Sequence, residues 1–482
     1  MILVKLNQAN FEYDIYSLIK AFYPRENVGV TAEDKTYDEP ADMVFEITYL
    51  PDSVRIAGKG EYSVDEVFAE DYADRIETKN RLKRKLYEIL AAHTKQALPW
   101  GTLTGIRPTK IPLKMLEAGG SDAQIAAHMR KEYYVSAEKI ALSTAIAKRE
   151  LALLNRLDYE NGYSLYIGIP FCPTTCLYCS FPSNPVAAWS GRVDEYLRAL
   201  EREIEYAADA FLDKHLNTVY IGGGTPTTLE PAQLERLLCK VKGSFSFAHC
   251  LEFTVEAGRP DSITKEKLSV LREQGISRIS INPQTMKQQT LRTIGRRHTV
   301  EQTVESFHMA RALGFDNINM DLILGLPGES LEDVESTLKQ IQALAPDNLT
   351  VHSLARKRAA RLSIEWEDYK GYQMVNTQEH MDLAMDYAAR MGLEPYYLYR
   401  QKGMAGNLEN VGFAAEGMAG IYNILIMEEK QTIVALGAGS ITKRVFMDGQ
   451  ARRCENVKDV AQYIGRIDEM IERKKRLFED KA

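Results

Sequence analysis

The sequence predicts an α/β protein in three parts, and the prediction rests on a long central alternation of strand-like and helical stretches. Between residues 163 and 358, six short apolar runs alternate with five longer amphipathic runs. Such alternation favours a parallel sheet built from βαβ units. Six units indicate a partial (β/α)6 barrel rather than a closed eight-stranded one. The predicted domains are an N-terminal α+β domain over 1–155, the barrel over 156–360 and a mainly helical C-terminal extension over 361–482.

The individual elements follow from local patterns. In the N-terminal part the strand candidates are MILVKL, MVFEITYL and SVRIAG, and the helical stretches are YDIYSLIKAFY and NRLKRKLYEILAAH. In the central part the strand candidates are YSLYIGIP, NTVYIGG, LEFTVEAG, SRISINPQ, NINMDLILGLPG and LTVHSLA. The helical runs between them are VDEYLRALEREIEYAADAF, PAQLERLLCKV, ITKEKLSVLREQG, VEQTVESFHMARALG and LEDVESTLKQIQALA. Apolar residues recur in these runs on one helical face, as expected for helices that cover a sheet.

Composition limits the class of protein. The chain of 482 residues has a formal net charge of −7, which argues against a protein that coats nucleic acid. It has no uninterrupted apolar run that would span a bilayer, and its first residues turn polar too soon for a signal peptide. We therefore expect a cytoplasmic protein without a membrane partner. Six cysteines in so long a chain are too few for a disulfide scaffold, so their clustering indicates a metal site or catalysis.

Three of the six cysteines lie in CPTTCLYC, directly after the first central strand candidate. A CxxxCxxC run lets one loop present three thiolates, which favour an iron–sulfur cluster, zinc or copper. A structural zinc site normally has four ligands, and the nearest histidines, His215 and His249, belong to other predicted elements. Three thiolates around a four-iron cluster would instead leave one iron open to a ligand.

Two further motifs follow strand candidates, at the carboxyl edge where ligands gather in such sheets. Glycines Gly222, Gly223 and Gly224 end the second strand, where they would allow the backbone close to a ligand or form a tight turn. Glu256 ends the third strand, where a carboxylate accepts hydrogen bonds from a ribose diol in other nucleotide sites. The cysteine loop and both motifs would therefore share one opening.

These motifs carry a resemblance. YIGIPFCPTTCLYC followed by YIGGGTPT resembles the radical S-adenosylmethionine (SAM) superfamily. TVEAGRPDSI, SRISINPQTMKQQTLRTIGRRH and NINMDLILGLPGES follow in the order typical of the oxygen-independent coproporphyrinogen III dehydrogenase family and its haem-chaperone relatives. The likeness covers about 163–358 closely, and YYLYRQKGMAGNLENVGFA at 396–414 is most similar to the HemZ-like branch. The resemblance implies a partial radical SAM barrel.

The resemblance also implies the cofactor ligands. Cys172, Cys176 and Cys179 match the cysteines that hold a [4Fe-4S] cluster, whose open iron binds the amino and carboxylate groups of SAM. The residues that match the site of this SAM are Tyr166, Gly222, Gly223, Gly224 and Glu256. Without the resemblance, Tyr166 would be read as an inward-pointing barrel residue.

A second SAM is implied by a separate set of matches: Tyr178, Gly224, Thr225, Gln284, Arg296, Asp321 and Ala355. Arg296 offers bidentate pairing to a carboxylate and Asp321 an acceptor for an amino group, so the two together would bind an amino acid. The alternative is an ordinary salt bridge between Arg296 and Asp321.

The resembled reaction is the oxidative decarboxylation of coproporphyrinogen III to protoporphyrinogen IX in haem biosynthesis, in which a radical derived from SAM removes a hydrogen atom from a propionate. Phe181 departs from the decarboxylases, which usually have a further cysteine there, and matches the chaperone-like members. The alternatives are therefore a haem chaperone and a radical SAM methyltransferase acting on haem.

A tetrapyrrole with four carboxylates requires several fixed cations. The candidates are Arg356, Lys357, Arg358, Arg361, Arg400, Lys402, Lys443 and Arg444, each of which is otherwise a solvated surface charge. Tyr396, Tyr397 and Tyr399 are candidates for a tetrapyrrole face or for ordinary core. The partners that the resemblance implies are the tetrapyrrole and an electron donor such as flavodoxin or ferredoxin.

Overall fold

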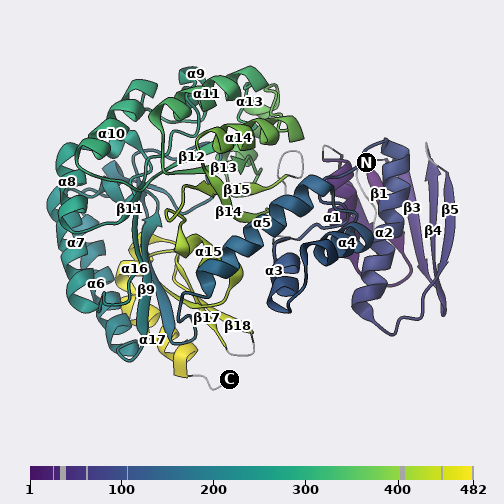
Figure 1. Ribbon diagram of the computed structural model, residues 1–482, viewed down its shortest axis with the longest axis horizontal. Coiled ribbons are helices and arrows are strands. Elements are labelled where there is room, and N and C mark those ends of the chain that lie inside the picture. Colours follow the sequence, from purple (N-terminus) through teal and green to yellow (C-terminus); the bar gives the residue numbers. More distant parts are fainter. Residues whose placement is uncertain are drawn as a thin grey trace. The chain divides into compact units, whose positions relative to one another are not determined.

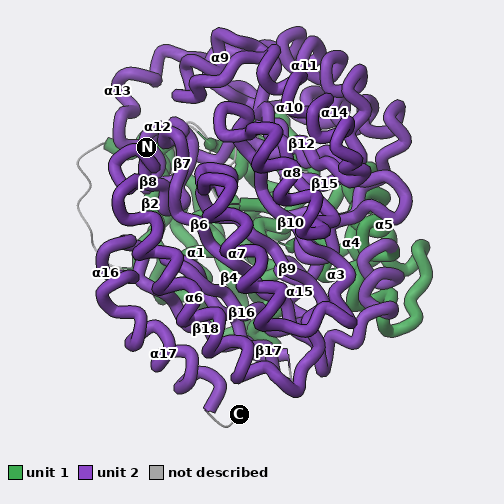
Figure 2. The backbone as a smooth tube through the Cα atoms, turned by 90° about the vertical axis from the view of Figure 1, so that its left-hand side faces the viewer, with its two compact units in different colours: residues 1–148, 400–408 green, residues 149–399, 409–482 purple. Residues whose placement is uncertain are grey.

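The computed structural model describes residues 1–24, 26–32, 40–60, 63–105, 107–401, 408–446 and 449–479. The chain divides into two compact units (Figure 2). Unit 1 comprises residues 1–148 and 400–408, and unit 2 comprises residues 149–399 and 409–482. No helix within the described ranges combines the length and the hydropathy needed to cross a membrane.

Unit 1 is built on a five-stranded sheet in the order β2-β1-β3-β4-β5. Its elements are β1 (Ile2–Leu6), α1 (Glu12–Phe22), β2 (Val28–Thr31), β3 (Met43–Tyr49), β4 (Ser53–Gly60), β5 (Val64–Ala69), α2 (Arg75–Thr94), α3 (Lys110–Glu117) and α4 (Asp122–Tyr133). The crossover through α1 makes β1 and β2 parallel, whereas the short connections among β3, β4 and β5 make them antiparallel. Buried and half-buried residues alternate along β3, so one face of the sheet packs on the core that α1 and α2 also enter. The division between the units falls within α5 (Ala137–Leu154).

Unit 2 contains the predicted parallel sheet. Its six consecutive parallel strands are β6 (Gly162–Ile169), β9 (His215–Gly223), β10 (Glu252–Glu256), β11 (Arg278–Ser280), β12 (Ile318–Leu324) and β13 (Asn348–Ser353). Nearly every residue of these strands is buried, as expected for a parallel sheet covered on both faces. The partial (β/α)6 barrel is therefore confirmed.

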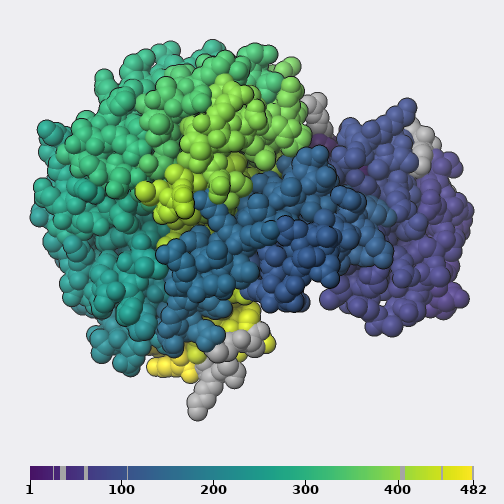
Figure 3. Space-filling model, viewed as in Figure 1, coloured from purple at the N-terminus to yellow at the C-terminus, as the bar shows by residue number. Residues whose placement is uncertain are grey.

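Helices connect these strands and cover the outside of the sheet (Figure 1). They are α6 (Val193–Ala210), α7 (Pro231–Ser244), α8 (Lys265–Glu273), α9 (Gln288–Thr293), α10 (Val300–Ala312) and α11 (Leu331–Leu344). In the space-filling view the teal and green residues that include these helices form a continuous surface on the face that is seen (Figure 3). The loops that leave the carboxyl ends of the strands are the segments that form a site.

The C-terminal part of unit 2 extends the sheet to eleven strands. On one edge β16 (Thr432–Leu436) pairs in parallel with β6, followed by antiparallel β17 (Ile441–Val445) and β18 (Ala451–Glu455). On the other edge β15 (Asn410–Ala414) and β14 (Glu394–Tyr399) pair antiparallel beyond β13. The helices of this part are α12 (Arg361–Ile364), α13 (Trp366–Tyr369), α14 (Gln378–Arg390), α15 (Ile421–Glu428), α16 (Val460–Gly465) and α17 (Ile467–Glu479).

Candidate active site

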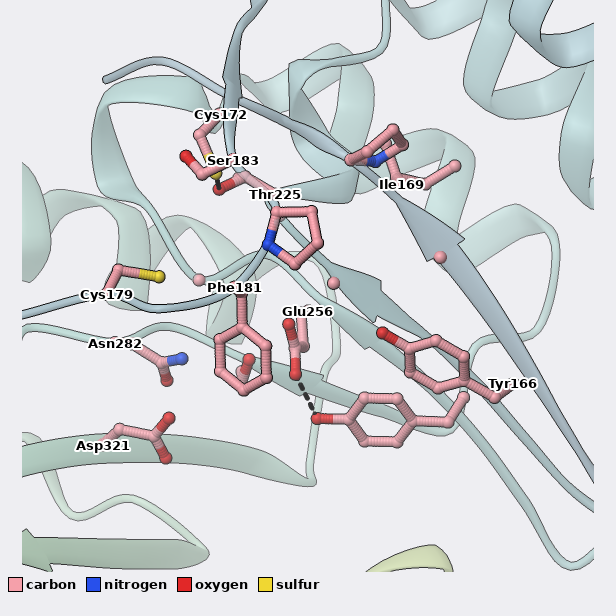
Figure 4. A pocket seen from close by; sticks show the side chains of 18 of the residues that line it. Tyr166, Ile169, Cys172, Cys179, Phe181, Ser183, Thr225, Glu256, Asn282 and Asp321 are labelled. Atoms are coloured by element: carbon pink, nitrogen blue, oxygen red, sulfur yellow. Dashed lines mark hydrogen bonds between the residues drawn. The ribbon is translucent and has the colours of Figure 1, made fainter. Parts of the chain in front are cut away.

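A cavity of about 530 Å³ lies within unit 2 at the carboxyl ends of the parallel strands. This volume is in the range of small-molecule sites. Of the site residues expected from sequence, those that line the cavity are Tyr166, Cys172, Cys176, Tyr178, Cys179, Gly223, Gly224, Thr225, Glu256, Gln284, Arg296 and Asp321. Gly222 and Ala355 are not among the described residues that line it. Figure 4 shows labelled side chains from the cysteine loop and from several strand ends around this one space.

The cysteine loop leaves the sheet through a short strand, β7 (Phe171–Cys172), which pairs with β8 (Asn184–Pro185). Leu177, between the second and third cysteines, is buried in an apolar cluster that includes Leu291 and Ile294. The Leu177 amide donates to the Ile294 carbonyl oxygen at 2.9 Å, and the Thr174 hydroxyl donates to the Gly295 carbonyl oxygen at 2.9 Å. The loop is therefore held to the barrel on both sides of Cys176.

The three thiols are free, and each faces a polar neighbour or another thiol. The Thr225 hydroxyl lies 3.6 Å from Cys172 Sγ (Figure 4). Burial raises the pKa of Cys179 to about 11 and also raises the pKa of Cys172. All three thiols line one cavity, and three cysteines on one loop are the donor set that an iron–sulfur cluster takes, so the chemistry of this loop fits such a cluster.

Arg259 was missed from sequence and contacts the middle cysteine. Its side chain is 3% exposed, and Nη1 lies 3.5 Å from Cys176 Sγ and 3.0 Å from the Thr174 hydroxyl. Nε and Nη2 donate to the two carboxylate oxygens of Asp261 at 2.9 and 2.6 Å. The carboxylate holds the guanidinium in one orientation, so a fixed positive charge faces the cluster position. The EAGRPD run contains both residues, but only the fold shows which cysteine they reach.

Neighbouring atoms leave little room for a side chain at the three glycines, even without a ligand. A Cβ on Gly222 would lie 2.9 Å from the Glu256 carboxyl carbon, and one on Gly224 would lie 2.4 Å from the Phe171 carbonyl oxygen. Gly223 has φ +103°, a conformation that favours glycine. The Gly224 amide donates to the Ile169 carbonyl oxygen at 2.7 Å. The glycines thus let the strand end pass close to β6, and their contact with a ligand stays a prediction.

Glu256 lies beside a stack of tyrosines. The Tyr220 hydroxyl donates to the Glu256 carboxylate, and the Tyr220 ring lies 4.5 Å from that of Tyr422 and 6.2 Å from that of Tyr166, measured between centroids. Burial, together with the charge of Asp321, raises the pKa of Glu256 to about 7. Glu256 is therefore partly protonated at neutral pH. Tyr220 and Tyr422 were not singled out from sequence, although the tyrosines of YIGGG and GIYNIL could have suggested an aromatic wall.

The residues matched to a second SAM lie on neighbouring strand ends. Arg296 donates to the Asn282 carbonyl oxygen at 2.5 Å, while Asp321 accepts from the Asn319 amide group at 2.7 Å and lies 3.8 Å from His352. Arg296 and Asp321 form no ion pair with each other, so the salt-bridge alternative is wrong. Burial acts to raise the pKa of Asp321, but His352 and Asn319 outweigh it and lower the pKa. Asp321 is therefore an anion that faces the cavity.

Backbone and polar groups around these residues indicate a bound polar molecule. Gln284 has φ +67°, an uncommon conformation for a residue other than glycine, and strained residues of this kind cluster at functional sites. Among the described residues, four buried cavity-lining atoms lack a hydrogen-bond partner: Arg278 Nε, Ser280 Oγ, Asn282 Oδ1 and Arg296 Nε. Buried polar atoms are normally satisfied. A ligand with both donors and acceptors, such as SAM, fits this wall.

The cations expected for a tetrapyrrole are mostly elsewhere. Lys443 lines the cavity and pairs with Glu429 at 2.8 Å. Arg444 donates to backbone carbonyl oxygens of α17, and Arg400 belongs to unit 1, where it donates to the Leu103 carbonyl oxygen at 2.5 Å. Lys402 is outside the described residues. Arg356, Lys357, Arg358 and Arg361 are not among the described lining residues.

The cavity lining includes a cation and aromatic residues besides those expected from sequence. Arg278 is buried and lines the cavity on β11, an orientation that a short strand such as RISI does not reveal. Tyr397 and Tyr399 also line the cavity, whereas Tyr396 is fully buried and belongs to the core. The cavity therefore combines Arg278, Arg296 and Lys443 with an aromatic wall.

Comparison with known proteins agrees with this site. The model of the radical SAM superfamily matches residues 166–341. The solved structure of coproporphyrinogen III oxidase (HemN) from Escherichia coli, a radical SAM enzyme, is 26% identical with a TM-score of 0.53, over 67% of this chain and 72% of that one. The class that fold and site define is thus a radical SAM protein, whose cofactors are a [4Fe-4S] cluster and SAM.

Two curated relatives narrow the class. The oxygen-independent coproporphyrinogen-III oxidase-like protein HemZ of Bacillus subtilis is 40% identical over 462 residues, which cover 92% of each chain. The haem chaperone HemW of the same organism is 41% identical over 192 residues, which cover 40% of this chain and 50% of HemW. The chain belongs to the family of radical SAM proteins that includes HemN, HemZ and HemW, and it matches HemZ over nearly its whole length.

Proposed function

We propose that the protein is a radical SAM oxidoreductase that decarboxylates two propionates of coproporphyrinogen III to vinyl groups, giving protoporphyrinogen IX. The observation that carries the proposal is the single cavity shared by the cysteine loop, by Glu256, and by the trio Gln284, Arg296 and Asp321. A protein that only carried haem would not need a second amino-acid site beside its cluster.

The cofactor roles follow from the lining of the cavity. Cys172, Cys176 and Cys179 would hold the cluster, and Arg259 would fix the charge at its edge. When bound, the cluster and SAM supply a radical that removes hydrogen from an unactivated carbon. Glu256 would accept the ribose hydroxyls, with its acceptor oxygens oriented by the Tyr220 hydroxyl.

The second set of residues would bind another SAM or one end of the substrate. Arg296 offers a guanidinium edge to a carboxylate, and Asp321, kept ionised by His352, offers an acceptor to an ammonium group. Arg278 would neutralise a propionate, because an unpaired carboxylate is unfavourable in a buried site. Tyr397 and Tyr399, stacked with centroids 6.1 Å apart, would lie against the tetrapyrrole and exclude water.

The proposal is tested by an anaerobic assay of reconstituted protein with SAM, dithionite and coproporphyrinogen III, with carbon dioxide and porphyrin products measured. We expect decarboxylated product from the wild type. Asp321→Asn should lower product formation by about 10²-fold or more while the electron paramagnetic resonance (EPR) signal of the cluster is kept, because it removes the anion proposed to position a reactant. SAM cleavage without a decarboxylated tetrapyrrole would refute the proposed substrate.

A haem chaperone is the second candidate, favoured by Phe181 and by the likeness to HemW. Phe181 stands on the cavity lining beside Cys179 where the decarboxylases usually have a cysteine. A chaperone would bind haem one to one and return it unmodified, so absorption titration with haem followed by product analysis separates the two functions.

We propose a cytoplasmic reaction with flavodoxin or ferredoxin as reductant.

A further inference from the structure

Four cations expected to bind substrate lie instead outside the described cavity lining, in the segment beside the cysteine loop, and Arg297 joins them. This basic collar consists of Arg297, Arg356, Lys357, Arg358 and Arg361. Arg361 Nη1 lies 3.4 Å from the Thr175 carbonyl oxygen, and the Leu362 amide donates to the Leu177 carbonyl oxygen at 2.8 Å. Lys357 Nζ lies 5.7 Å from the centre of the Phe181 ring. The segment after β13 therefore lies directly against the cysteine loop.

Arg297 lies in the loop between α9 and α10, close along the chain to residues that contact the cysteine loop. It follows Gly295, whose carbonyl oxygen accepts from Thr174, and its own side chain is exposed. Arg356 and Arg358 are exposed as well. The collar thus comes from two connections, after β11 and after β13, that meet at the CPTTCLYC loop.

Most of the collar is not neutralised. Within the described ranges, Arg297, Arg356, Lys357 and Arg358 form no ion pair with a carboxylate. Three acids lie at α12 and α13. Glu365, between the two helices, accepts from Arg361, and Glu367 pairs with Lys370, which leaves Asp368 as the one acid of this segment without a described ion pair. The surface over the cysteine loop is therefore positive on a chain whose net charge is −7.

An apolar group lies within this charged rim. Phe181 is 65% exposed, and Ile364 at the end of α12 is 72% exposed. An exposed apolar centre with a charged rim is the usual anatomy of a protein docking surface. Phe181 also lines the cavity, so this partly exposed ring stands where the cavity reaches the surface.

We propose that the basic collar and Phe181 form the docking surface for a small acidic protein that donates one electron to the cluster. Electron transfer needs a short path, and the loop that carries the three cysteines is itself only half-buried at Thr174 and Thr175. The protein as a whole is negative and repels an acidic partner, whereas the basic collar attracts it. Charge therefore orients the partner toward the cysteine loop. The carrier is oxidised by one electron and the cluster is reduced by one, without transfer of an atom. The inference depends on the cluster and not on which tetrapyrrole is converted.

The test compares two charge reversals of equal size. The docking variant is Arg297→Glu with Arg356→Glu and Arg358→Glu. The matched control is Arg156→Glu with Lys214→Glu and Arg272→Glu, three exposed cations near the amino ends of the parallel strands. The probe is a flavodoxin with reduced flavin mononucleotide, and the measurements are its Kd for the reconstituted protein and the EPR-detected rate of cluster reduction.

We expect the docking variant to bind flavodoxin at least about tenfold more weakly and to accept its electron about tenfold more slowly at low salt, with the difference shrinking as salt screens the charges. Dithionite, a small reductant, should reduce the cluster of both variants as it does the wild type. The control should match the wild type throughout.

Three results would overturn the proposal: unchanged flavodoxin binding in the docking variant, equal weakening in the control, or a raised KM for the tetrapyrrole with donor binding intact. The last result would assign the collar to substrate carboxylates. Loss of cluster reduction by dithionite in the docking variant would mean that the cluster site itself was damaged. The neutral variant Arg297→Gln with Arg356→Gln and Arg358→Gln then tests the proposal. It should weaken flavodoxin binding relative to the wild type, by a smaller factor than the charge reversal.

Discussion

Arg259 provides a sharp test of how the fold prepares the cysteine loop. Its guanidinium is held by Asp261 and lies 3.5 Å from Cys176 Sγ. Replacing it by glutamine removes the positive charge nearest the proposed cluster. The reduced cluster carries one more negative charge than the oxidised one, so loss of the cation should make the reduction potential more negative.

The size of the effect follows from the distance. Two unit charges 3.5 Å apart interact by about 5 kcal/mol at an effective dielectric constant of 20, which is an upper bound. Asp261 offsets part of the charge and the added electron is shared over the cluster, so we expect about 1–2 kcal/mol. For a one-electron couple this is about 40–90 mV. Removing Arg259 also leaves a mostly buried carboxylate without its partner, which lowers the free energy of unfolding by about 3–5 kcal/mol.

The assay is an EPR-monitored redox titration of the reconstituted variants, normalised to iron content. Arg259→Gln should shift the potential down, Arg259→Lys should shift it by less than half as much because the charge remains, and Asp261→Asn should shift it up because the guanidinium is no longer offset. Equal potentials in Arg259→Gln and wild type, at full iron content, would refute the role of this charge.

Three further outcomes follow from the structure. Burial raises the pKa of Glu256 from 4.5 to about 7, so the free energy of unfolding, measured by urea denaturation, should fall as pH rises through about 7. Under the proposed ribose contact, SAM affinity measured by calorimetry should rise over the same range, because the ionised carboxylate is the better acceptor. Glu256→Gln should flatten both profiles. Gly224→Ala puts a Cβ 2.4 Å from a backbone carbonyl oxygen and should abolish SAM binding measured by calorimetry. The control Gly243→Ala, whose Cβ would meet nothing within 4 Å, should bind SAM as the wild type does. Equal SAM binding by both variants would contradict the prediction that crowding at Gly224 matters. Lys474→Met leaves the buried Glu203 carboxylate without its ion-pair partner and should lower the free energy of unfolding, measured by urea denaturation, by about 3–5 kcal/mol. Adding Glu203→Gln should recover part of this stability. An unchanged free energy of unfolding in Lys474→Met would show that the ion pair does not stabilise the fold.

The sequence by itself determined the features that depend on neighbours along the chain. The spacing of Cys172, Cys176 and Cys179 places three thiols on one loop whatever the fold around it. The alternation of buried strands and amphipathic helices indicated six parallel strands, because side-chain periodicity is a local property. The strand ends then had to lie at one edge, which brought Glu256 near the loop.

Only the tertiary structure decided which distant residues meet. Arg259 reaches Cys176 across 83 positions of sequence, and Arg278 enters the cavity because β11 has a particular register between β10 and β12. Arg356 and Arg358 looked like substrate ligands from their position after a strand, yet the turn beyond β13 leaves them exposed beside the cysteine loop. A shift of one residue in a strand reverses every side chain, so local pattern cannot choose between cavity and surface at such positions.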